Sequence, residues 1–267
     1  MDIIVCIKQV PGTSNVEVDP DTGVLIRDGI ETKMNPFDLF ALETALRLKE
    51  EKESEGLDAT VNVLSMGPPQ AAEVIKEAYM MWADKGFLLS DKRFAGADVL
   101  ATSHTLCQGI KKIGRFDLIL CGKQTTDGDT AQVGAEIAEF LNIPHMSNVL
   151  SILKTGRDSL VVEMDMPDTV ELASIKCPCL LSVEKNIFQP RLPSYKKKIL
   201  TKERKIEVLS LKDLDDKDLD NYGLDGSPTR VEKIFPPDSN DEKEKWTGNS
   251  EELALGIVEK LKELKII

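Results

Sequence analysis

Apolar runs alternate with amphipathic segments through the first 150 residues of the chain. Short aliphatic runs predict buried strands, and apolar residues at helical spacing predict helices that pack on them. The expected strands are residues 2–7, 60–65, 86–89 and 118–121, and the expected helices are residues 35–48, 70–82, 98–113 and 131–141. Asn35 is the expected cap of the first helix, with Pro36 at its first position. This βαβα order predicts an α/β fold with a doubly wound, mainly parallel sheet and right-handed crossovers.

The pattern becomes β-rich after residue 147. Apolar segments at residues 149–153, 159–163, 170–175 and 180–183 predict a β-hairpin region that continues or flanks the sheet.

Beyond Pro190 the chain is rich in Pro, Lys and Asp and has few long apolar runs. Such a stretch cannot bury enough apolar surface to form a core of its own, so we expect it to be disordered or laid over another chain. We therefore expect an α/β domain at residues 1–189 and a C-terminal arm at residues 190–267. Apolar residues at helical spacing between Ser250 and Ile267 predict an amphipathic helix at the end of the arm, capped by Ser250.

The polar loop at residues 122–134 leaves the last expected parallel strand and enters a helix, which is where open α/β sheets hold nucleotides. Gly122 and Gly128 allow positive φ at little steric cost, so that main-chain N–H groups can close around a phosphate. Asp129 or Thr130 is the expected cap of the helix, whose first-turn N–H groups would remain available to an anion. An ordinary exposed turn between a strand and a helix would have a similar polar sequence. Neither a P-loop nor a GxGxxG pattern is present.

Composition narrows the class of protein. The 267 residues carry a net charge of −12, which argues against non-specific binding to nucleic acid or to an anionic membrane. There is no apolar run of membrane-spanning length, and the N-terminus enters a strand at once, so we expect no signal peptide, no membrane insertion and a cytoplasmic location. The five cysteines are typical of reduced thiols in a core, and Cys177-Pro-Cys179 lacks the second pair that a zinc site needs.

Five short motifs lie at expected strand exits or helix starts. They are VCIKQVP at 5–11, MNPF at 34–37, SMGP at 65–68, GKQ at 122–124 with the acidic loop that follows, and QVG at 132–134. In this order they resemble the β subunit of electron transfer flavoprotein, over essentially the whole chain. The resemblance implies a Rossmann-like fold of the adenine nucleotide alpha hydrolase type.

The resemblance also implies an α subunit as partner in a heterodimer and an adenine nucleotide in the β subunit. Many members hold a structural AMP there, whereas members that bifurcate electrons hold a second FAD that receives hydride from NADH. The positions that match the family's nucleotide contacts are Cys6, Asn35, Pro36, Phe37, Asp38, Met66, Gly122, Lys123, Gln124, Thr125, Thr126, Asp127, Gly128, Asp129, Thr130, Ala131, Gln132 and Val133.

The loop departs from the AMP-type pattern Gly-Lys-Gln-Ala-Ile-Asp-Asp-Asp. It reads TTDGDTAQ at 125–132 and is similar to the bifurcating class, as are residues 8–11, 19–23, 94–98 and 101–105. Gly128 replaces an acidic side chain, which removes bulk and charge beside the site and favours FAD. The resemblance then implies NADH oxidation at this FAD, with electrons split between an acyl-CoA dehydrogenase and ferredoxin or flavodoxin. Because the flavin supplies the redox chemistry, we expect no catalytic acid, base or nucleophile.

The family docks on acyl-CoA dehydrogenases through a loop that precedes the arm. Residues 189–195 match its position, and Leu192 is the expected apolar anchor, although a leucine between prolines could equally make a structural contact. Three other functions remain open. They are a non-bifurcating electron carrier with AMP, an ATP-binding stress or adenylation protein of the same broad fold, and an interaction scaffold without a redox cofactor.

Overall fold

The computed structural model describes residues 1–12, 31–231 and 244–267. The chain forms two compact units, of which the first contains the described residues up to 231 and the second contains residues 244–267. The stretch at residues 19–23 that resembles the bifurcating class lies outside the described residues.

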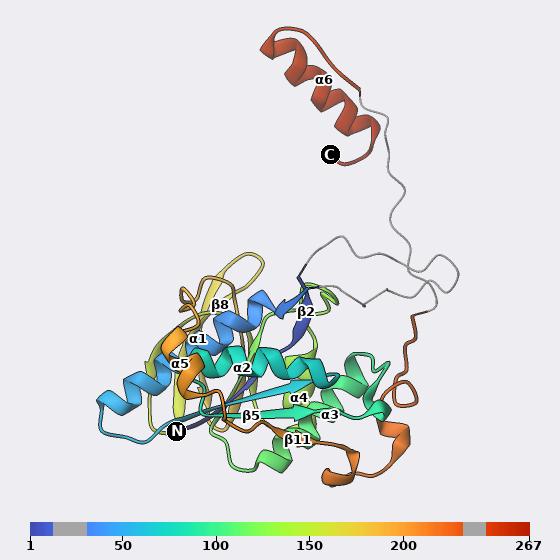
Figure 1. Cartoon of the computed structure of the whole chain (residues 1–267). Helices are drawn as coiled ribbons and strands as arrows, with labels where there is room; N and C mark the ends of the chain where they lie inside the picture. The colour runs from blue at the N-terminus through green and yellow to red at the C-terminus, as the bar shows by residue number, and fades with distance from the viewer. Residues whose placement is uncertain (13–30, 232–243) are drawn as a thin grey trace. The chain divides into compact units, whose positions relative to one another are not determined.

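Figure 1 shows the whole chain. Nine of the described strands form one sheet in the order β11-β5-β4-β1-β6-β10-β7-β8-β9. The strands are β1 (Asp2–Cys6), β4 (Thr60–Met66), β5 (Lys85–Leu89), β6 (Leu118–Gly122), β7 (His145–Thr155), β8 (Ser159–Asp165), β9 (Val170–Lys176), β10 (Cys179–Val183) and β11 (Glu207–Leu209). Pairing is parallel from β11 to β7 and antiparallel from β7 through β8 to β9. The mainly parallel sheet is therefore confirmed, and the β-hairpin region continues it at one edge. A separate antiparallel ribbon joins β2 (Gln9–Pro11) to β3 (Thr32–Met34).

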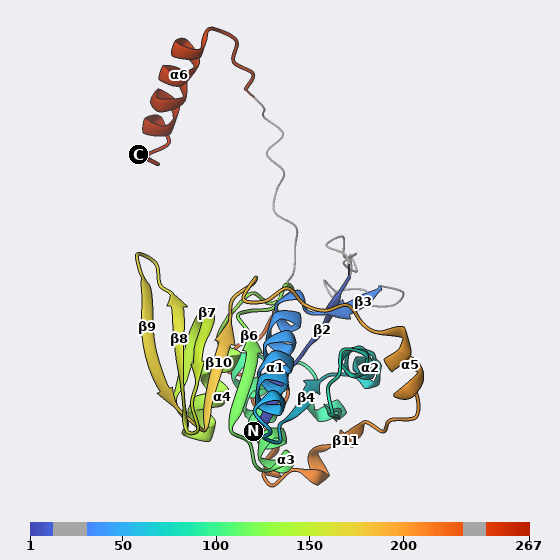
Figure 2. The same ribbon diagram turned by 90° about the vertical axis from the view of Figure 1, so that its left-hand side faces the viewer.

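Helices cover both faces of the sheet (Figure 2). The α-helices of the first unit are α1 (Pro36–Ser54), α2 (Ala72–Met80), α3 (Val99–Ile113), α4 (Val133–Leu141) and α5 (Tyr195–Leu200). Short 3₁₀ turns are η1 (Pro69–Ala71), η2 (Lys92–Phe94), η3 (Leu211–Asp213) and η4 (Leu219–Asn221). Helices α1 and α2 pack on one face and α3 and α4 on the other, which confirms the doubly wound arrangement.

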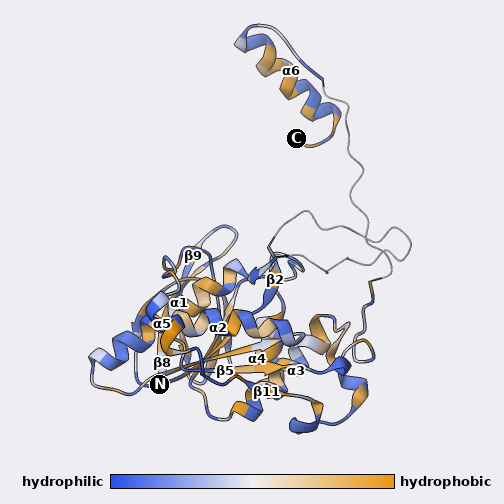
Figure 3. Cartoon of the chain, in the orientation of Figure 1, coloured by the Kyte–Doolittle hydropathy of each residue, from blue (hydrophilic) through white to orange (hydrophobic). Residues whose placement is uncertain are grey.

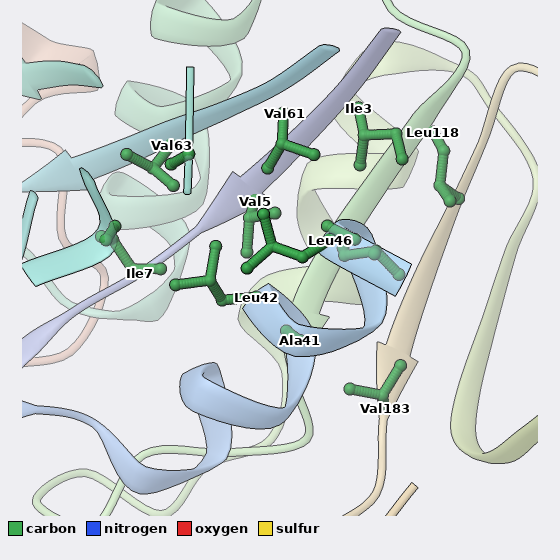
Figure 4. Close-up of a cluster of buried hydrophobic side chains, with 14 of the residues drawn as sticks. Ile3, Val5, Ile7, Ala41, Leu42, Leu46, Val61, Val63, Leu118 and Val183 are labelled. Carbon is green, nitrogen blue, oxygen red and sulfur yellow. The ribbon is translucent and has the colours of Figure 1, made fainter. Parts of the chain in front are cut away.

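Strand β1 shows why the sheet is apolar on both faces. Ile3 and Val5 point toward α1, where they meet Leu42 and Leu46 (Figure 4). Ile4 and Cys6, which alternate with Ile3 and Val5, belong instead to the cluster under α3 and α4. A strand that is covered on both sides needs a continuous apolar run, and each fully buried aliphatic side chain stabilises the fold by about 1.5–3 kcal/mol.

Part of the segment after Pro190 packs on the first unit, whereas we expected disorder or packing on another chain. Strand β11 pairs in parallel with β5 and extends the sheet beyond the expected boundary at residue 189. Leu211 and Tyr222 are buried in the α3 side of the core, and the Tyr222 ring lies 5.5 Å from that of Phe94. These apolar residues are too sparse to build a core alone, but the finished sheet supplies the rest. Part of the expected arm thus lies over this chain itself.

The second unit carries helix α6 (Ser250–Glu263). Asn249, rather than Ser250, caps this helix, in a reciprocal arrangement with Glu252. Figure 3 shows that α6 carries both apolar and polar side chains, as the sequence predicts. Among the described residues, every helix is too short or too polar to cross a lipid bilayer.

Candidate functional site

The order of the strands creates a switch point beside β1. The chain builds β4 and β5 on one side of β1 and then returns to place β6 on the other side. In such sheets a crevice opens at the carboxyl ends of the strands where the direction of winding reverses, and ligands bind there. The loop at residues 122–132 leaves β6 at this point.

Gly122 ends β6 against the first turn of α1. A Cβ atom at this position would lie 2.6 Å from Oδ1 of Asp38 and 2.6 Å from the carbonyl carbon of Phe37. Atoms do not approach this closely, so a residue larger than glycine would push the helix away from the strand. The glycine therefore serves close approach. The positive φ that glycine allows is not used, since neither Gly122 nor Gly128 has positive φ.

Asn35 precedes α1 and ties it to the loop. Its side chain makes no cap on the helix, contrary to expectation. The amide Nδ2 instead donates to Oδ1 of Asp38 and to the carbonyl oxygen of Gln124, both at 2.9 Å, and Oδ1 accepts from the main-chain N–H of Thr126 at 3.3 Å. Because Asn35 is fully buried, these bonds set the position of the loop.

Asp38 is the second buried anchor of this region. The main-chain N–H of Lys8, which follows β1, donates to its Oδ2 at 2.7 Å. Burial raises the pKa of Asp38 to about 7, while hydrogen bonds from Asn35 and Lys8 act in the opposite direction. The carboxyl group joins the exit of β1 to α1, so Asn35 and Asp38 support the site with side chains that are already engaged within the protein.

Three polar pairs hold the side chains of the loop. Lys8 Nζ contacts both carboxylate oxygens of Asp127 at 2.8 Å, Lys123 pairs with Glu184, and the Gln124 amide bonds Asp129. Burial would raise the pKa of Asp127, but the bond from Lys8 outweighs it and the pKa is lowered. Glu184 was not among the expected site residues, and its only signal was a charge directly after an apolar strand.

The backbone before α4 is strained and leaves the helix end open. Helix α4 begins at Val133, and its N-terminal residue Gln132 makes no side-chain cap, so neither Asp129 nor Thr130 plays the expected role. Asp129 and Ala131 have φ of 53° and 56°, which costs about 1–2 kcal/mol for a residue other than glycine. Strain of this kind gathers at ligand sites, and uncapped first-turn N–H groups attract anions.

Gly128 lies between the two acidic residues of the loop and is exposed. A Cβ at this position would meet only the hydroxyl oxygen of Thr125, at 3.3 Å. Among the described residues, neither φ nor packing therefore demands a glycine at this position.

The remaining expected residues lie around the same edge. Cys6 ends β1 opposite Cys121 of β6, and a hydrogen bond with Cys6 together with burial raises the pKa of Cys121. Met66 ends β4, and Pro36 and Phe37 begin α1. Thus β1, α1, β4 and the loop bring the expected contacts together, whereas Leu192 precedes α5 and belongs to a different surface.

An open doubly wound sheet with an uncapped helix start at its switch point is the arrangement at which nucleotide-binding α/β proteins hold their ligands. The electron transfer flavoprotein domain matches residues 22–214 of the chain. The electron transfer flavoprotein subunit beta of Clostridium acetobutylicum is 43% identical over 263 residues, which cover 98% of both chains. The caffeyl-CoA reductase-Etf complex subunit CarD of Acetobacterium woodii is 42% identical and the acryloyl-CoA reductase electron transfer subunit gamma of Anaerotignum propionicum is 37% identical, each over the full length of both chains.

The chain belongs to the electron transfer flavoprotein family, among its β subunits. Members of this family bind flavin or AMP, and the β subunits pair with an α subunit.

Proposed function

We propose that this chain is the β subunit of an electron-bifurcating flavoprotein. Paired with its α subunit, it binds FAD at the carboxyl edge of β1 and β6 and oxidises NADH there. The electrons are divided between an acyl-CoA dehydrogenase and ferredoxin or flavodoxin. The observation that carries this proposal is Gly128, in a loop where the AMP-type pattern has an acidic residue.

The surroundings of Gly128 support this choice. The glycine satisfies no demand of the fold, because only the flexible side chain of Thr125 lies within reach of a Cβ. The neighbouring carboxylates of Asp127 and Asp129 already repel phosphate oxygens, and a third one would add to that repulsion. Glycine leaves space for the pyrophosphate of FAD and adds no negative charge beside it.

The names of two relatives support the same proposal. One belongs to a caffeyl-CoA reductase-Etf complex and another is an acryloyl-CoA reductase electron transfer subunit. Both names place a subunit of this family with an enzyme that reduces an acyl-CoA compound.

The residues around the site have distinct parts in holding such a nucleotide. The first-turn N–H groups of α4 would receive the phosphates, while Asn35 and Asp38 hold the loop in place from behind. When bound, FAD supplies the hydride-accepting and one-electron chemistry, which no side chain of the protein provides. The protein contributes orientation and electrostatic surroundings.

The nucleotide content of the purified heterodimer tests the site. Two FAD molecules per heterodimer are expected after denaturation and chromatography. One FAD and one AMP would favour the non-bifurcating carrier, and a preparation without flavin absorption would favour the scaffold. Electron splitting is tested separately with NADH, crotonyl-CoA, an acyl-CoA dehydrogenase and ferredoxin. Ferredoxin that stays oxidised while the dehydrogenase turns over would contradict bifurcation.

Docking on the dehydrogenase is proposed for the loop at residues 189–195. Leu192 is 87% exposed, so it makes no structural contact that would explain a leucine at this position. An apolar anchor between two prolines is suited to a pocket on a partner. The cytoplasmic location expected from the sequence stays a prediction.

A further inference from the structure

The loop at residues 189–195 is held firmly except at its tip. The main-chain N–H of Ser194 donates to the carbonyl oxygen of Met80, at the end of α2, at 3.0 Å. On the other side of Leu192, Arg191 turns inward toward α1. Leu192 itself points into solvent. The contacts on each side of this exposed side chain therefore decide how it is presented.

Arg191 makes a two-carboxylate anchor on α1. Its Nε and Nη2 donate to the two carboxylate oxygens of Glu43 at 2.8 and 3.1 Å, and its main-chain N–H donates to Glu43 at 3.1 Å. Nη1 and Nη2 also donate to Glu50 at 2.6 and 3.2 Å. Bidentate bonds from a guanidinium set direction as well as distance.

Burial makes this anchor different from an ordinary surface ion pair. The Glu43 side chain is 1% exposed and also accepts from Arg47 Nε at 2.9 Å. Burial would raise the pKa of Glu43, but the bonds from Arg191 outweigh it and the pKa is lowered, so the pair is ionised. Exposed ion pairs hold side chains loosely, whereas a buried and doubly bonded one does not.

Trp82 supports the loop from the side of α2. It has φ of 88°, which is a rare conformation for a bulky residue, and its ring lies 5.6 Å from the Arg191 guanidinium and 5.1 Å from Lys197 Nζ. Both cations lie within the range of a cation–π contact. The strained turn thus places an aromatic ring within reach of Arg191, which precedes Leu192, and of Lys197 in the helix that follows the loop.

We propose that Arg191 is a positioning residue for docking, which holds the backbone at Leu192 in one conformation through Glu43, Glu50 and Trp82. This inference rests on the proposed docking of Leu192. A loop that is ordered before binding loses less conformational entropy on association, so its affinity is higher than that of a mobile loop with the same leucine. Loosening the anchor weakens docking by about fivefold to tenfold, although the leucine is unchanged.

The test compares variants of the assembled heterodimer. Glu43→Gln removes the charge of the buried partner and Arg191→Lys keeps a positive charge but loses the bidentate bonds. Glu73→Gln is the matched control, because Glu73 pairs with Lys76 on the exposed side of α2 and does not touch the loop. Binding is measured to an acyl-CoA dehydrogenase that exchanges electrons with the unmodified heterodimer, and hydrogen exchange is followed at Arg191, Leu192 and Ser194.

The anchor variants are expected to exchange these amides faster and to raise the Kd about fivefold to tenfold, with flavin content and α-subunit assembly unchanged. The control is expected to match the unmodified protein. In a Leu192→Ala background, Glu43→Gln is expected to cause no further loss of affinity, because the anchor acts through the leucine. Should Glu43→Gln fail to fold, Arg191→Lys and the exposed Glu50→Gln carry the same comparison.

Two outcomes separate the inference from the function on which it rests. If Leu192→Ala leaves the Kd unchanged, docking by this loop is wrong. If Leu192→Ala weakens binding while the anchor variants keep both the Kd and the amide exchange of the unmodified protein, docking stands and the positioning role of Arg191 is wrong. Equal losses from Glu43→Gln with and without Leu192 would also overturn it.

Discussion

Asn35 donates a hydrogen bond of 2.9 Å to the carbonyl oxygen of Gln124, 89 residues further along the chain. This bond, with those to Asp38 and from Thr126, places the start of α1 against the loop that follows β6. A side chain that was expected to cap its own helix thus supports a distant loop. Removal of the Asn35 side chain is the most direct test of how the loop at residues 122–132 is held.

Asn35→Ala is expected to lower the free energy of unfolding by about 2–3 kcal/mol, because buried groups of the loop lose their partners. Nucleotide should also be lost faster from the heterodimer on dilution or gel filtration. Asn221→Ala is the control, since the Asn221 amide bonds Asp216 on an exposed segment. Equal retention of nucleotide in both variants would contradict the role of Asn35.

The two glycines of the loop should respond differently to substitution. Gly122→Ala is expected to destabilise the protein by about 2–3 kcal/mol, because its methyl group would overlap Asp38 and Phe37. Gly128→Ala should change stability by no more than about 0.5 kcal/mol, as at other exposed positions. Urea denaturation of the two variants measures this contrast. Similar losses of stability in both would contradict the close contact between Gly122 and the first turn of α1.

Substitutions at Gly128 also test the proposed cofactor. Gly128→Asp is expected to reduce FAD from two to about one per heterodimer, because it restores bulk and charge beside the pyrophosphate. Gly128→Asn has nearly the same size without the charge, so the difference between the two variants isolates electrostatic repulsion. Two FAD molecules per heterodimer in both variants would contradict the inference that Gly128 favours FAD.

Asp38 gives the protein a specific dependence on pH. Its pKa is raised from 3.8 to about 7, so the folded protein binds a proton more tightly than the unfolded chain. The stability that this contributes is complete below about pH 4 and is lost as the pH rises through about 7. Asp38→Asn cannot titrate and lacks this loss.

Unfolding free energies of both proteins between pH 5 and 8 test this sign. The stability of the unmodified protein relative to Asp38→Asn is expected to fall by an amount of the order of 1 kcal/mol per pH unit between pH 5 and about 7, and to level off above pH 7. Asp127→Asn provides the contrasting case, because the lowered pKa of Asp127 contributes stability that is complete above about pH 4 and is lost only at lower pH. The difference between the unmodified protein and Asp127→Asn is therefore expected to stay constant between pH 5 and 8. A constant difference between the unmodified protein and Asp38→Asn across the range would show that Asp38 titrates normally in the folded protein.

Several features of the fold and site could be predicted from the sequence because their causes are local. The apolar run of β1 and the helical spacing after Pro36 each reflect which faces are covered, and their order implies the switch point beside β1. The loop at residues 122–132 was identified by its place between a strand and a helix. The helix caps were less predictable. The Asn35 side chain bonds the loop instead of its own helix, and α4 begins at Val133, too far along the chain for Asp129 or Thr130 to cap it.

The sequence by itself determined the order of strands and helices, the doubly wound sheet and the place of the loop proposed as the nucleotide site, because hydrophobic periodicity and short motifs act within a few residues. Only the tertiary structure decided that β11 completes the sheet edge, that Asn35 bonds the loop instead of its helix, and that Arg191 meets Glu43 across 148 residues. Such contacts form between side chains whose neighbours are set by the folded backbone, and nothing in the local pattern specifies them.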